Sequence, residues 1–104
     1  MVVHNSVKQN AYYDSVTLML FSSAMGDVPG VVEAAAMMGT DHNKALMKSS
    51  GILTDEVAAT VTPNDLVIGI SAESQEVIDA ALKVLDEKFG FNGATVAAEV
   101  KAML

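Results

Sequence analysis

The chain has 104 residues, 51% of them hydrophobic, and six Lys and Arg residues against thirteen Asp and Glu give a formal net charge of -7 at pH 7. This acidic balance excludes a nucleic-acid-binding protein, because clustered basic residues bind the phosphate backbone. The lack of cysteine excludes disulfides, thiolate metal sites and a cysteine nucleophile, and no apolar stretch approaches the roughly 20 residues that cross a bilayer, so we expect a soluble, cytoplasmic protein without a membrane partner.

The first predicted element is a strand over Val2–Val7. Its composition is typical of a strand, but the consecutive polar residues His4, Asn5 and Ser6 interrupt the alternation. A strand with polar side chains on both faces is expected at the edge of a sheet. We therefore predict an edge strand.

The next apolar run, Val16–Phe21, fits a helix and a buried strand nearly equally well. Asp14 or Ser15 can cap a helix and Gly26 can end it. Periodicity alone does not separate the two structures in so short an apolar run.

The segment Val31–Met38 is also ambiguous, since its alanines favour a helix and its two valines favour a strand. Gly39 ends this run. A helix over Asp41–Ser49 then begins at a cap formed by Thr40 or Asp41 and stops at Gly51. Two helices so close together would be awkward, so we predict a strand over Val31–Met38.

The second half of the chain has the clearest patterns. Thr62–Asp65 is predicted to be a turn, and the apolar, β-branched run Leu66–Ser71 is predicted to be a strand in the middle of the sheet. Ser74 caps an amphipathic helix that ends at Gly90. The tail, Ala94–Leu104, is predicted to be a short final helix.

This alternation predicts one α/β domain over residues 1–104. We expect a small β-α-β-α-β-α sandwich with a three-stranded, mostly parallel or mixed sheet and a C-terminal helix. The mean hydropathy of +0.35 is high for so small a domain. It suggests that another subunit or domain covers one face.

One turn is a candidate anion site. Gly39, Thr40, Asn43 and Lys44 join a strand end to a capped helix, where free backbone N–H groups, a nearby lysine and a small residue favour a phosphate or carboxylate. The alternative is that Thr40 only caps the helix and that Asp41 already offsets the helix dipole.

No other pattern indicates chemistry. His4 and His42 are the only histidines, and His42 is expected to be a solvated residue of the first helical turn. The carboxylates fall mainly at helix starts and on wet faces, without metal-ligand spacing. We predict no catalytic residue, no metal site and no cofactor.

Three parts of the sequence together resemble the N-terminal domain of FdrA-type acyl-CoA-synthetase-like proteins. They are Tyr12–Met19, then Met37–Thr40 with Asn43–Leu46, then Thr62–Leu66. The likeness covers roughly residues 2–89, and its most specific part is the combination of Met-Gly-Thr with Asn-Lys-Ala-Leu.

The resemblance implies a longer protein, in which this domain precedes a CoA-binding-like nucleotide fold and a ligase-like domain. It also implies a carbamoyl-transfer system that acts on oxamate during purine-ureide breakdown, and it favours a helix over Ser15–Met25. The glycine-rich nucleotide turn and phosphorylatable histidine region of the later domains are not in this sequence.

We therefore predict a non-catalytic domain or small subunit of an FdrA-like acyl-CoA synthetase or carbamoyl-transfer enzyme, serving assembly and anion or substrate binding. Its expected partner is a second copy or a subunit that carries the CoA-binding-like domains. The alternative is a self-assembling structural or regulatory module without enzymatic activity, joined through Val2–Val7 or through methionine-rich faces.

Overall fold

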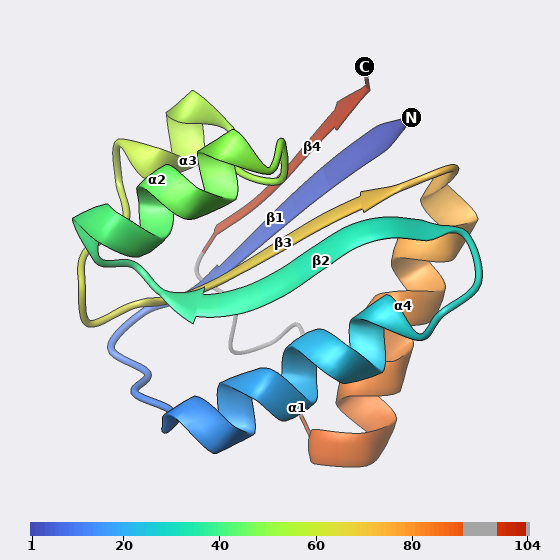
Figure 1. Ribbon diagram of the computed structural model, residues 1–104, viewed down its shortest axis with the longest axis horizontal. Coiled ribbons are helices and arrows are strands. Elements are labelled where there is room, and N and C mark those ends of the chain that lie inside the picture. The colour runs from blue at the N-terminus through green and yellow to red at the C-terminus, as the bar shows by residue number, and fades with distance from the viewer. Residues whose placement is uncertain (91–97, 104) are drawn as a thin grey trace.

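The computed structural model describes residues 1–90 and 98–103, with side chains up to residue 90 (Figure 1). Its elements in chain order are β1 (Val2–Lys8), α1 (Ser15–Gly26), β2 (Val31–Met38), α2 (Asp41–Ser49), α3 (Asp55–Ala58), β3 (Leu66–Ala72), α4 (Gln75–Phe89) and β4 (Ala98–Met103). The predicted alternation of strands and helices is confirmed, and so are the strand at 31–38 and the helix that begins at Ser15.

The four strands form one sheet in the order β2-β3-β1-β4, and all neighbouring strands are antiparallel. This is a split βαβ arrangement, because α1 carries the chain from β1 to β2 and leaves a place between them that β3 fills. In Figure 1, α1 and α4 lie on one face of the sheet, while α2 and α3 lie over the other face.

The predicted sheet was therefore wrong in two respects. It is antiparallel rather than mostly parallel or mixed, because β3 returns between β1 and β2 instead of adding to one side. The predicted C-terminal tail helix is replaced over Ala98–Met103 by β4, which pairs with β1. The backbone groups of β1 that point away from β3 pair with β4. A helix at this position would leave those groups unpaired. Residues 94–97 and 104 of the predicted tail helix lie outside the described residues.

The prediction of an edge position for β1 was also wrong. β1 lies between β3 and β4, and His4, Asn5 and Ser6 are all buried. Their polarity is accommodated by hydrogen bonds: His4 Nε2 lies 2.7 Å from Ser6 Oγ, and Asn5 bonds to backbone groups of the loop between α2 and α3. The polar residues of β1 are therefore explained by hydrogen-bond partners inside the protein and not by an edge position.

The helix starts follow the predicted caps. Asp14, Thr40 and Ser74 each accept a hydrogen bond from the backbone N–H three residues later, which satisfies a group that the helix itself leaves unpaired. Gly90 ends α4 in the left-handed conformation, with φ of 68°. The four-residue helix α3 was not predicted, since its sequence is short and mixed.

Each face of the sheet has its own core. On the side of α1 and α4, the buried residues include Phe21, Met25, Ile68, Ile78 and Leu85. A smaller core lies beneath α2 and α3 and includes Met47, Ile52, Val57, Val61 and Val67. The predicted central position of β3 is confirmed, since every residue of β3 is buried.

No helix within residues 1–90 and 98–103 is both long and apolar enough to cross a membrane.

Candidate functional site

The structure brings the four residues of the predicted anion site into one turn between β2 and α2. Thr40 Oγ1 accepts from the backbone N–H of Asn43 at 3.1 Å, and the Asn43 amide donates to the carbonyl of Met38 at 2.9 Å. Both side chains therefore satisfy backbone groups of the turn itself.

The Lys44 ammonium is also engaged by the fold. Nζ donates to the carbonyls of Ala58 and Val61, at 3.2 and 3.3 Å, and lies 3.6 Å from the Asp41 carboxylate. The two carbonyls lie at and just beyond the end of α3, where unpaired carbonyls favour a cation. Lys44 therefore holds α3 against α2.

Gly39 meets a packing requirement. A Cβ atom at this position would overlap the Val61 side chain and would lie 2.6 Å from the Thr62 carbonyl oxygen. The chain after α3 therefore occupies the space that a ligand would need for close approach. These contacts explain all four residue types by folding alone, and anion binding at the turn stays a prediction.

The two histidines lie in contrasting places. His42 is exposed on the first turn of α2, as predicted, and His4 is buried beside Ser6 on β1. The buried Asp65 carboxylate accepts hydrogen bonds from the backbone N–H groups of Thr62 and Asn10, both at 3.0 Å. These bonds lower the pKa of the Asp65 carboxyl. Asp65 thus ties the loop after β1 to the turn before β3.

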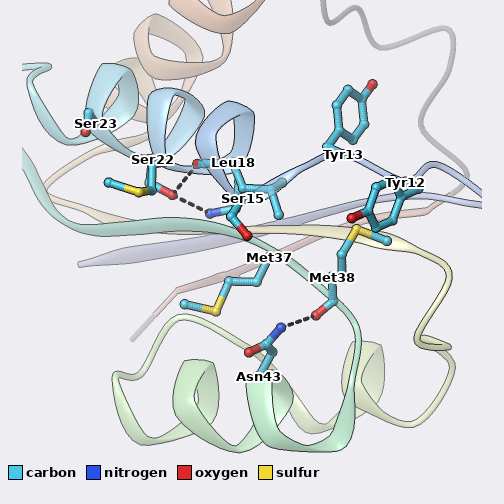
Figure 2. A pocket seen from close by; sticks show the side chains of 11 residues that line it. Tyr12, Tyr13, Ser15, Leu18, Ser22, Ser23, Met37, Met38 and Asn43 are labelled. Carbon is cyan, nitrogen blue, oxygen red and sulfur yellow. Dashed lines mark hydrogen bonds between the residues drawn. The ribbon is translucent and has the colours of Figure 1, made fainter.

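A pocket of about 480 Å³ lies between α1 and β2. Figure 2 shows Ser15, Leu18 and Ser22 on the α1 side, and Met37 and Met38 on the β2 side. Tyr12 and Asn43 also line the pocket. No lining residue carries a charge, so the pocket suits an apolar or uncharged occupant.

The outer edge of β2 forms one wall of this pocket. Ser22 Oγ donates to the Leu18 carbonyl at 3.0 Å and accepts from the N–H of Ala36 at 2.9 Å. Asn43 covers the Met38 carbonyl from the other end, as Figure 2 shows. Two side chains therefore shield part of a strand edge that would otherwise be open to pairing.

Next to the pocket, α1 presents a second apolar face to solvent. Phe21, Ala24 and Met25 are buried against the sheet and α4, yet Val16, Met19 and Leu20 are 65%, 68% and 52% exposed. The residues of α1 include no charged side chain. A surface helix is normally polar on its outer side, and a helix that is apolar all round is normally buried on both sides. The outer face of α1 is therefore an exposed apolar surface, of the kind that often marks an interaction site.

Comparison with known proteins identifies the family of this chain. A family model described as AllF, heavy metal-associated domain, matches residues 1–102. The chain belongs to this family. The AllF-type domain is also similar to the uncharacterized protein YahF of Escherichia coli K12, with 35% identity over 89 residues that cover 86% of this chain and 17% of YahF. The chain thus spans about a sixth of the length of YahF. No solved structure matches the chain.

The family description raises the question of a metal site. Heavy metals prefer thiolate ligands, and this AllF-type domain has no cysteine. Within the residues that the structure describes, no three His, Cys, Asp or Glu side chains gather closely enough to hold an ion. The residues that the structure describes do not fit a heavy metal.

The α1 surface and the pocket were missed by sequence reasoning. The signal was present in Val16–Phe21, whose apolar residues follow no single face. That pattern made helix and strand hard to separate, and it is itself typical of a helix covered on two sides. Ser22, which directly follows this run, accepts a hydrogen bond from the β2 edge.

Proposed function

We propose that the chain is the non-catalytic assembly domain of an FdrA-like acyl- or carbamoyl-transferring enzyme. The observation that carries the proposal is the uncharged, apolar outer face of α1, with Met19 68% exposed. Exposing such an apolar face to water is unfavourable in free energy, and association with a partner removes this cost by burying the face.

The family supports this role through chain length. The related YahF is about six times as long as the region that the chain matches, so in that relative the matched region is one part of a much larger protein. The FdrA-like sequence segments indicate that such a partner carries CoA-binding-like domains. We therefore propose that partner as the one joined by the assembly domain.

Mixing tests this proposal. The purified chain and a subunit with the CoA-binding-like domains, combined at micromolar concentration, are expected to elute together in size-exclusion chromatography. Met19→Asp should weaken that association without changing the thermal unfolding temperature, because the Met19 side chain is mainly in solvent. A clean failure of the wild-type chain to associate would count against the proposal.

The second candidate function is a self-assembling structural or regulatory module. Its specific support is the outer edge of β2, which has the strand pairing capacity first expected of Val2–Val7. Light scattering separates the two functions, since this one requires an oligomer of the chain without any partner. Anion or substrate binding by Gly39, Thr40, Asn43 and Lys44 remains a further part of the first proposal.

A further inference from the structure

We propose that the pocket between α1 and β2 binds an uncharged aromatic compound of one or two rings that carries an N–H or O–H donor. This is a small-molecule site, and the assembly role neither requires nor includes it. The proposal rests on the size of the pocket, its lack of charge, the side chains that form its walls, and an acceptor that the protein leaves open.

The pocket has the size and the interior of a small-molecule site. Its volume is about 480 Å³, which lies inside the range of about 300–1,000 Å³ that is usual for ligand pockets. Buried and half-buried side chains give it an apolar interior, and they belong to Leu18, Ala36, Met37 and Met38. Such walls favour a ligand whose body is apolar, because water leaves both surfaces on binding.

The charges around the pocket select an uncharged ligand. Among the described residues that line it, none carries a charge. At the start of α1, the Asp14 carboxylate caps the helix and Lys8 Nζ donates to the Tyr13 hydroxyl at 2.8 Å. At the other end, Lys44 lies 3.6 Å from the Asp41 carboxylate. A charged ligand would therefore lose its water without gaining a counter-ion, which is unfavourable.

The walls of the pocket favour an aromatic ring in particular. Met19, Met37 and Met38 bring thioether groups to the lining, and Tyr12 adds an aromatic ring. In Figure 2, the Met38 side chain is directed toward Tyr12. Thioether sulfur makes favourable contacts with aromatic rings, and aromatic rings pack well against one another. Methionine side chains are also flexible enough to follow the outline of a planar ligand.

Asn43 requires a hydrogen-bond donor on the ligand. Its amide nitrogen donates to the Met38 carbonyl at 2.9 Å, so the orientation of the amide is fixed and Oδ1 can only accept. Across residues 1–90, no protein group donates to Oδ1, and none bonds to the hydroxyls of Ser15 and Ser23. Figure 2 shows the Ser15 hydroxyl directed toward β2. Since hydroxyls can donate or accept, Asn43 is the residue that makes the ligand a donor.

The test is an NMR titration of the isotope-labelled chain with indole, N-methylindole and an indole carboxylate. Indole should cause saturable shifts of the backbone amide signals of Ala36, Met38 and Asn43. N-methylindole lacks the donor and should bind about tenfold more weakly. The carboxylate should not saturate these shifts at millimolar concentration. No saturable shift with indole, or equal affinity for the three compounds, would overturn the proposal.

A variant and a contact measurement locate the ligand. Ser23 is exposed and lines the pocket, so Ser23→Trp should fill the pocket without unfolding the domain and should weaken indole binding at least about tenfold. Ser49→Trp, at an exposed position of α2, is the control and should bind indole as the wild type does. Nuclear Overhauser contacts from indole to the methyl groups of Met37 and Met38 place the ligand independently. Contacts confined to other side chains would contradict the site.

The ligand site and the assembly role fail separately, because the titration uses the chain alone. If indole binds and the chain does not associate with the larger subunit, the assembly role is wrong and the ligand site stands. If indole does not bind, yet Ser23→Trp weakens association with that subunit, the pocket receives a side chain of the subunit. The small-molecule proposal is then wrong.

Discussion

Asn5 on β1 and Gly69 on β3 are partners in the sheet, and together they hold the loop between α2 and α3 against it. The Asn5 amide donates to the Ile52 carbonyl, and its oxygen accepts from the N–H of Thr54 at 3.0 Å. A Cβ atom at position 69 would overlap that same Ile52 carbonyl. A buried amide beside a glycine thus allows one face of the sheet to receive the α2–α3 segment.

Replacing Asn5 should detach this segment. We expect Asn5→Ala to lower the free energy of unfolding by about 2–4 kcal/mol, because the buried Ile52 carbonyl and Thr54 N–H lose their partner. Urea unfolding followed by circular dichroism measures this loss. Asn64→Ala, at an exposed asparagine, is the matched control and should stay within about 0.5 kcal/mol of wild type. Equal stability of the two variants would refute the role of Asn5.

Gly39 is expected to be required for packing. Gly39→Ala should lower the free energy of unfolding by about 1–3 kcal/mol, since the new methyl group meets Val61 and the Thr62 carbonyl. Gly26→Ala is the control, because the space around Gly26 is open and it lies in α1, so alanine there should leave stability equal or higher. Thermal unfolding of both variants in plain buffer is sufficient. A neutral Gly39→Ala would reopen this position to a ligand.

The anion site at the turn makes its own prediction. Phosphate, oxamate, carbamoyl phosphate or CoA, at about 100 times its dissociation constant, would stabilise the fold by roughly 2.7 kcal/mol. Lys44→Ala would abolish that shift, whereas Lys48→Ala, which removes an exposed lysine paired with Asp55 at 3.0 Å, would keep it. Thermal unfolding with each compound measures the shift. No shift with any of the four would leave Lys44 as the residue that joins α2 to α3.

Asp65 should make stability depend on acid. Hydrogen bonds from Thr62 and Asn10 hold the pKa of its carboxyl below the ordinary value. A pKa that is lower in the folded protein gives stability that is fully present above the unfolded-state value of about 3.9 and is lost as the pH falls through the folded value. Urea unfolding of wild type and Asp65→Asn should therefore differ most above about pH 4. A difference that stays constant down to pH 2 would contradict this assignment.

Local patterns determined most of the elements that could be predicted. The caps at Asp14, Thr40 and Ser74 and the apolar run of β3 are short-range signals, and the structure confirms each. The sheet could not be derived in this way, because strand direction depends on how the α1 crossover leaves a place for β3. For the same reason, β1 was placed at an edge, although pairing with β4 buries it.

The candidate site likewise has a part that local sequence predicts and a part that depends on the fold. The residues of the turn at Gly39 were found together because they are close in sequence, and their contacts with Val61 and Ala58 became visible only in the fold. The α1 surface depends on which side of a helix the rest of the domain covers. The periodicity of an apolar run does not show which side of the helix will be covered. Met19 could therefore be assigned to the surface only from the structure.

The most direct test of the assembly role is the rate at which Met19 is oxidised by dilute peroxide, measured by mass spectrometry. Met25 on the same helix is fully buried and is the internal control. We expect fast oxidation of Met19 in the dilute monomer and at least about tenfold slower oxidation once the chain is assembled, whether with a second copy or with the larger subunit. Oxidation of Met19 at the monomer rate in every assembled state would contradict the account, because it would leave the outer face of α1 without a partner.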